Sequence, residues 1–170
     1  GTAVGTPTFA AVGKLGRALE FGGPGSGDYM PLDAIVAGST WSWAAWIKPE
    51  LAAGSYGTLL TNGSSNGIYY HSNSGNTKKI RVYASGAYDL GSALTEGEWT
   101  HVALTNNAGI VQLYLNGLAS GVPLNIVGES FTFTRMGGNA GNSEMFKGRI
   151  DEVQLAVGVV WSASRIRASY

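Results

Sequence analysis

The chain has 170 residues, of which 44% are hydrophobic and 13% charged, and its formal net charge at pH 7 is zero. This length and hydrophobic content suit one folded domain with a substantial core and exclude an intrinsically disordered chain. The balanced charge argues against nucleic-acid binding, and no apolar run approaches the roughly 20 residues of a membrane-spanning helix. The absence of cysteine excludes disulfides, thiol catalysis and thiolate metal sites.

The 26 glycines are scattered rather than periodic, which favours an all-β domain with many turns. Turn residues recur at roughly ten-residue intervals, as in β-sandwiches. Ser162–Tyr170 predicts a short helix with Ser162 as its N-cap. We expect a single domain over 1–170 from a longer protein, because neither a starting Met nor a signal peptide opens the chain. The predicted strands are Ala18–Phe21, Tyr29–Pro31, Ser42–Lys48, Gly57–Thr61, Gly67–His71, Lys79–Ala84, His101–Asn106, Val111–Leu115, Phe131–Met136 and Gly148–Ala156.

Strict alternation marks the segment 41–48 and the two arms of a hairpin over 99–117. Each strand is expected to bury one set of side chains and to turn the other set outward. The outward set includes Trp46, His101, Gln112 and Tyr114. The inward set consists of Trp41, Trp43, Ala45, Ile47, Val102, Leu104, Val111, Leu113 and Leu115.

Five motifs follow one another along the chain. They are Gly16-Arg-Ala-Leu-Glu-Phe-Gly22 followed by Asp28-Tyr29, the segment 41–49, Trp99-Thr-His-Val-Ala103, Leu113-Tyr-Leu-Asn-Gly117 and Phe146-Lys-Gly-Arg-Ile-Asp-Glu-Val153. Together they resemble the laminin-G-like branch of the concanavalin A-like lectins and glucanases. The resemblance implies an antiparallel β-sandwich, a jelly roll of two curved sheets with a short C-terminal helix. It also implies a carbohydrate-binding or adhesion role in extracellular proteins; a minority of relatives hydrolyse glycans, and many bind calcium.

Glycoside hydrolysis requires two carboxylates held roughly 5 to 9.5 Å apart. The resemblance implies a Glu-x-Asp-x-Glu pattern for a hydrolase, and the chain has none. Asp151 and Glu152 are adjacent, so on a strand they point to opposite faces. We expect a structural role for His101, a solvated His71 at the end of a strand, and no enzymatic activity.

Sugar recognition combines aromatic rings with polar groups that bind hydroxyls. We expect Trp46, Arg81, Tyr83, Gln112 and Tyr114, from the polar sides of several strands, to form such a surface. The alternative is a partly buried face covered by a loop.

Two loops rich in glycine, amides and hydroxyls form a second candidate site. The segment 64–70 contributes Asn66 and Tyr69, and the segment 137–145 contributes Asn139 and Asn142. By motif order they resemble the calcium and ligand loops of pentraxins. Glu144 is their single carboxylate, which argues against a ligand-bridging calcium ion, and ordinary turns are the alternative.

The resemblance also implies a structural calcium ion between the first strand region and the last strand. Glu20 and Asp151 stand at the matching positions. A salt link or a hydrogen bond from Asp151 to a nearby turn is the alternative.

The resemblance and the missing catalytic acids together favour a non-catalytic, monomeric carbohydrate-binding module. It would target an extracellular enzyme or surface protein to a neutral or lightly charged polysaccharide. A protein-interaction or adhesion domain is the alternative, followed by a small glycan hydrolase or lyase.

Overall fold

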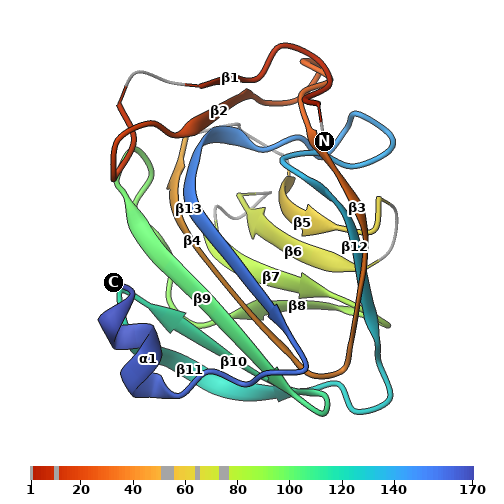
Figure 1. Ribbon diagram of the computed structural model, residues 1–170, viewed down its shortest axis with the longest axis vertical. Coiled ribbons are helices and arrows are strands. Elements are labelled where there is room, and N and C mark those ends of the chain that lie inside the picture. The colour runs from red at the N-terminus through yellow and green to blue at the C-terminus, as the bar shows by residue number, and fades with distance from the viewer. Residues whose placement is uncertain (1, 10–11, 51–55, 64–65, 73–76) are drawn as a thin grey trace.

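The computed structural model describes residues 2–9, 12–50, 56–63, 66–72 and 77–170. These residues form two antiparallel sheets that face each other, with strand orders β1-β2-β13-β4-β9-β10-β11 and β3-β12-β5-β6-β7-β8 (Figure 1). The expected antiparallel β-sandwich is therefore confirmed. The elements are β1 Thr8–Phe9, β2 Leu19–Gly22, β3 Met30–Gly38, β4 Trp41–Pro49, β5 Tyr56–Thr61, β6 Gly67–His71, β7 Lys79–Tyr83, β8 Ala87–Leu90, β9 Thr100–Asn107, β10 Ile110–Leu115, β11 Leu118–Asn125, β12 Phe131–Met136, β13 Lys147–Val157 and α1 Ala163–Ala168.

All ten predicted strands overlap with observed strands, but three strands were not predicted. These are β1, β8 and β11. β11 contains Gly121 and Pro123, which weaken a strand pattern and are tolerated at the edge of a sheet. The strand expected at Tyr29–Pro31 extends to Gly38 as β3.

The core lies between the inner faces of the two sheets, where strand alternation directs the apolar side chains. Trp41 and Trp43 are fully buried, and the Trp41 ring meets Phe131 and Phe133 edge-on at centroid distances of 5.3 and 5.6 Å. The predicted inward set of the 99–117 hairpin is confirmed, with Leu115 half-buried against this core.

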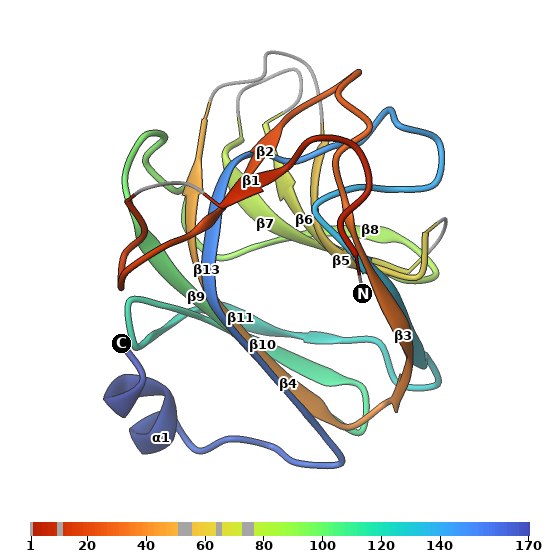
Figure 2. The same cartoon turned by 45° about the horizontal axis from the view of Figure 1, so that its top comes forward.

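The outer face of the seven-stranded sheet is partly covered by the C-terminal segment (Figure 2). Trp161 and Ile166 are buried there against Ala44 and Ala103. Ser162 is the N-cap of α1, as predicted, because its hydroxyl accepts a hydrogen bond from the Arg165 amide at 3.2 Å. Within the described residues, no helix is long and apolar enough to cross a membrane.

Strand β13 is irregular in its middle. The register with β4 shifts between Asp151 and Gln154, and Glu152 has a φ of 49°. This β-bulge interrupts the regular alternation of faces from which we expected Asp151 and Glu152 to point to opposite faces.

We expect replacement of Gly148 by alanine to destabilise the fold strongly. A Cβ at Gly148, whose φ is +127°, would collide with the backbone carbonyl oxygen of Lys48 on the neighbouring strand. The free energy of unfolding should fall by about 3 kcal/mol or more in urea titrations followed by tryptophan fluorescence. Gly158 is the control, since its φ is +72° but an added Cβ would have no atom within 4 Å. Gly158→Ala should therefore lower the free energy of unfolding by only about 1 kcal/mol. Equal costs for the two variants would contradict this packing.

Candidate functional site

The residues predicted to share one aromatic and polar surface lie on two opposite sides of the molecule. Trp46, Gln112 and Tyr114 belong to the seven-stranded sheet, and Arg81 and Tyr83 belong to the six-stranded sheet. In both sheets these side chains alternate with the core residues, so they face outward. The core therefore separates the two groups, and the expectation of one combined surface is wrong.

The surface around Trp46 is largely covered. Trp46 is 5% exposed, and its ring stacks on Tyr170 at 5.5 Å while the ammonium group of Lys14 lies 4.0 Å from the ring centroid. Tyr114 packs against the cluster beneath α1, and the amide nitrogen of Gln112 donates to the Leu113 carbonyl oxygen at 2.8 Å. This geometry corresponds to the alternative of a partly buried, covered face.

His101 lies beside Trp46, with 5.4 Å between the two ring centroids. The side chain is buried, and burial lowers the pKa of its imidazole. Its Nδ1 has no hydrogen-bond partner within the described residues, whereas its backbone amide binds the Asn116 side-chain oxygen at 2.9 Å. His101 thus contributes packing and a backbone hydrogen bond at the 99–117 hairpin.

A network of four side chains covers the outer face of β5 to β8. Arg81 donates to both carboxylate oxygens of Asp89, from Nε at 2.7 Å and from Nη2 at 3.0 Å. Its Nη1 also donates to the Tyr56 hydroxyl at 3.1 Å. His71 Nδ1 lies 2.9 Å from Asp89 Oδ1, and the His71 ring stacks on Tyr56 at 4.8 Å. We call Tyr56, His71, Arg81 and Asp89 the outer-face network.

The outer-face network corrects the expectation of a solvated His71, which is only 6% exposed. Sequence reasoning also missed Tyr56 and Asp89. The register supplies the reason: Tyr56 lies opposite His71, and Arg81 lies opposite Asp89 on the unpredicted strand β8. Strand pairing, which alternation within one strand does not reveal, brings these side chains together.

The charges in this network stabilise each other. Burial of the Asp89 carboxyl opposes its ionisation, but the hydrogen bonds and the positive charge of Arg81 outweigh burial and lower the pKa of Asp89. The same hydrogen bonds raise the pKa of Arg81. The network therefore presents a fixed, charge-assisted set of donors and acceptors beside an aromatic ring.

Two tyrosines continue this face toward the loops. Tyr83, two residues after Arg81, is 41% exposed. Tyr69 is buried and its hydroxyl lies 3.1 Å from the Thr61 hydroxyl. Burial raises the pKa of Tyr69 despite the hydrogen bond from Thr61, and the nearby groups of Glu144 and Tyr83 add to the increase.

The second predicted loop, 137–145, contacts strand β5 and the residue that precedes the first predicted loop. The Ala140 amide donates to the Gly63 carbonyl oxygen at 2.9 Å, and the Thr58 amide donates to the Glu144 carbonyl oxygen at 3.1 Å. Asn139 is buried, and its amide nitrogen donates to Glu144 Oε2 at 3.0 Å. The loop containing Glu144 therefore borders the strands that carry Tyr69.

The two other predicted loop residues are placed differently. The Asn66 amide nitrogen donates to the Ser130 carbonyl oxygen at 2.9 Å. Asn142 is exposed and has a φ of 54°. Residues 64–65 of the first loop lie outside the described residues.

The contacts of Glu20 and Asp151 do not fit a calcium ion between them. Glu20 accepts hydrogen bonds from the Arg149 guanidinium, from Nε and Nη2 at 3.3 Å each. Both Asp151 oxygens accept backbone amides, from Leu15 at 3.0 Å and from Glu152 at 2.9 Å. No group of three acidic, histidine or cysteine side chains able to hold a metal occurs among the described residues.

The comparisons with known proteins agree with this architecture. The family model of the concanavalin A-like lectin/glucanases superfamily matches residues 24–164. The fold and this match define a β-sandwich domain of the concanavalin A-like class. The chain belongs to the concanavalin A-like lectin/glucanases superfamily. Among curated proteins, the sequence has no significant match.

Solved structures with low sequence identity share the fold. Domain 4 of an extracellular arabinanase from Geobacillus stearothermophilus, in complex with arabinotriose, has a TM-score of 0.73 and 24% identity, with 99% of this chain and 81% of that chain covered. A Bacteroides ovatus protein with a proposed carbohydrate-binding role has a TM-score of 0.72 and 18% identity, with 88% of this chain and 45% of that chain covered. Trypanosoma rangeli sialidase has a TM-score of 0.63 and 17% identity, with 94% of this chain and 28% of that chain covered. The chain thus spans less than half of the last two proteins.

Replacement of Arg81 by methionine should destabilise the fold in a pH-dependent manner. The lowered folded-state pKa of Asp89 means that its ionised form stabilises the fold above its unfolded pKa of about 3.9, and this stabilisation is lost as the pH falls through the folded pKa. Arg81→Met should therefore lower the free energy of unfolding by about 1 kcal/mol at pH 7 and by less at pH 3, measured in urea.

Arg149→Met is the matched control, because Arg149 pairs with Glu20 at 3.3 Å on the other sheet. Because this pair is more exposed, Arg149→Met should lower the free energy of unfolding by less than about 0.5 kcal/mol at either pH. An equal cost of Arg81→Met at both pH values would show that Asp89 is not its main partner.

Chelation tests the predicted calcium ion. Because both carboxylates have other partners, we expect EDTA to leave the melting temperature unchanged. A decrease of several degrees that added calcium reverses and that Asp151→Asn abolishes would instead demonstrate an ion at this position, since loss of a bound ligand destabilises the native state.

Proposed function

We propose that this chain is a non-catalytic carbohydrate-binding module whose binding surface is the outer face of β5 to β8. It would serve as an extracellular, monomeric unit that holds an enzyme or surface protein on a polysaccharide. The observation that carries the proposal is the exposed ring of Tyr83 beside the outer-face network. An aromatic face next to fixed donors and acceptors suits a sugar ring, which has apolar C–H faces and a hydroxyl rim.

The surroundings of Tyr83 support the same proposal. The Tyr83 hydroxyl has no hydrogen-bond partner among the described residues, so it is free to bind a ligand. Asn142, on the loop that contains Glu144, is exposed and adds an amide group, whereas the amides of Asn66 and Asn139 bind within the protein. The chain has no net charge, which favours neutral or lightly charged glycans. The arabinanase domain, which was solved with arabinotriose, makes arabinan a suitable first test polysaccharide.

The chemistry of Asp89 favours binding over catalysis. A glycosidase requires one carboxyl group with a raised pKa to act as a general acid. Asp89 has a lowered pKa and is held by Arg81 and His71. It is therefore suited to orient Arg81, while proton donation to a leaving group is disfavoured.

A protein-interaction or adhesion domain is a second candidate. Exposed apolar side chains on β11 favour it: Leu118 is 58% exposed and Val122 is 85% exposed. Such residues are common at protein interfaces when they form a continuous patch.

Affinity electrophoresis on neutral polysaccharides, including arabinan, tests the proposed surface. The protein should be retarded by at least one of them, and Tyr83→Ala should weaken binding about tenfold, or ~1.4 kcal/mol. Tyr170→Ala is the matched control, because Tyr170 is an exposed tyrosine that follows α1 and stacks on Trp46 of the opposite sheet. Thermal melting of both variants checks that the fold is intact.

Absence of retardation on every polysaccharide would refute the proposed function. Loss of binding in Tyr170→Ala with normal binding in Tyr83→Ala would move the site to the surface around Trp46.

A further inference from the structure

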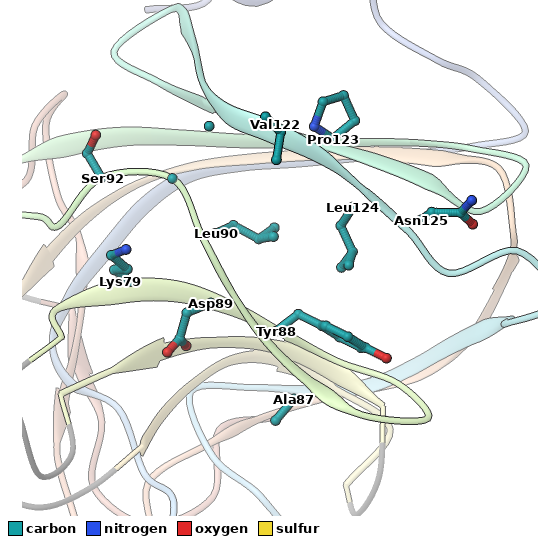
Figure 3. Close-up of a pocket in the computed structure, with 12 residues that line it drawn as sticks. Lys79, Ala87, Tyr88, Asp89, Leu90, Ser92, Val122, Pro123, Leu124 and Asn125 are labelled. Atoms are coloured by element: carbon teal, nitrogen blue, oxygen red, sulfur yellow. The ribbon is translucent and has the colours of Figure 1, made fainter.

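A groove of about 670 Å³ lies between the edge strands β8 and β11, where the two sheets meet (Figure 3). This volume is typical of small-molecule sites. The side chains of Leu90 and Leu124 point toward each other across the groove, and the ring of Tyr88 lies beside Leu124 (Figure 3). The floor of the groove is therefore apolar and partly aromatic.

Polar groups without partners surround this floor. The Lys79 ammonium and the hydroxyls of Tyr88 and Ser92 have no hydrogen bond or ion pair with any described residue. Asn125 uses its side-chain oxygen to accept the Val127 amide at 3.1 Å, which leaves its amide nitrogen available as a donor. An apolar floor with free donors and acceptors matches the amphipathic surface of a sugar.

At one end of the groove, the chain just after β8 approaches β11 closely. A Cβ on Gly121 would lie 2.9 Å from the Cα of Gly91, so the approach requires glycine. The Ser92 amide also binds the Ser120 hydroxyl at 3.1 Å at this end. The opposite end is lined by Ala87 and Asn125 (Figure 3). A groove bounded at one end by this close approach suits a chain end or a branch better than a polymer passing through.

An extended peptide fits this groove less well than a sugar. Pro123 on β11 has no amide hydrogen, and Gly121 has a φ of +74°, which departs from extended backbone. Both features hinder the regular ladder of hydrogen bonds that an added β-strand requires.

The groove is continuous with the outer-face network. Asp89 lines the groove and also pairs with Arg81 on the outer face. Lys79 lines the groove as well, and it lies opposite His71 in the β6–β7 register. A ligand on the outer face thus reaches the groove by crossing the single strand β8.

We propose that this groove is a second subsite, which receives a terminal or branch segment of a neutral oligosaccharide whose remainder lies across Arg81 and Tyr83. The inference rests on the proposed function and adds that the module prefers longer or branched oligosaccharides to short ones. The two subsites would act as linked contacts on one ligand, each adding to the affinity.

Isothermal titration with a size series of oligosaccharides, prepared from the polysaccharide that retards the protein, tests this subsite. Val122→Trp places a large side chain at the wall of the groove, on a residue that is 85% exposed and tolerates substitution. Leu118→Trp is the control, because Leu118 is exposed on the same strand but does not line the groove. We expect Val122→Trp to weaken binding of the longest oligosaccharide about tenfold, with little effect on the shortest, and Leu118→Trp to match the unmodified protein.

The outcomes separate the two proposals. Tyr83→Ala should weaken the binding of oligosaccharides of every length, while Val122→Trp should weaken the binding of the long ones alone. If the unmodified protein binds glycans and Val122→Trp binds all lengths normally, the groove subsite is refuted and the proposed function stands. If the unmodified protein binds no glycan, the proposed function fails first. Chemical shift changes at the amides of Leu90 and Leu124 on addition of the long oligosaccharide would support the subsite directly.

Discussion

The packing of Trp41 and Trp43 between the two sheets is the constraint on which the remaining structure depends. Both side chains project from the inner face of β4, a central strand of the seven-stranded sheet, and Trp41 meets the aromatic rings of β12 across the core. Because strand side chains alternate, burial of this set sends Trp46 outward on the same strand. With the same alternation in the other strands, the aromatic and polar candidates of the strands lie on two outer faces that the core separates.

These two outer faces differ in how far other parts of the chain cover them. The face of the seven-stranded sheet is covered around Trp46 by Tyr170 and beneath α1 by Trp161 and Ile166. The face of β5 to β8 instead carries charged and aromatic side chains that bind one another and leave Tyr83 exposed. The difference explains why an aromatic residue on a polar face is not by itself a ligand site: a terminal segment of the same chain can occupy it.

Much of the fold was predictable because alternation is a local property of the sequence. The inward sets of β4 and of the 99–117 hairpin follow directly from it. The candidate site was less predictable, because Arg81 acquires its partners through the pairing of β7 with β8 and of β5 with β6. Strand β8 is short and β11 contains Pro123, so neither shows a strong strand pattern. Coverage of Trp46 by Tyr170 is a long-range contact that no local pattern contains.

The position of the β8 and β11 edges beside each other also bears on the tendency of this protein to aggregate in concentrated solution. A domain with no net charge lacks the electrostatic repulsion that keeps many proteins apart, and exposed sheet edges then become sites of intermolecular strand pairing. Here the β8 and β11 edges approach each other at Gly91 and Gly121. Pro123 on β11 also lacks the amide hydrogen that strand pairing requires. Strand β3, at the far edge of the six-stranded sheet, carries Pro31 and Asp33. The β3, β8 and β11 edges thus carry features that hinder intermolecular strand pairing without relying on net charge.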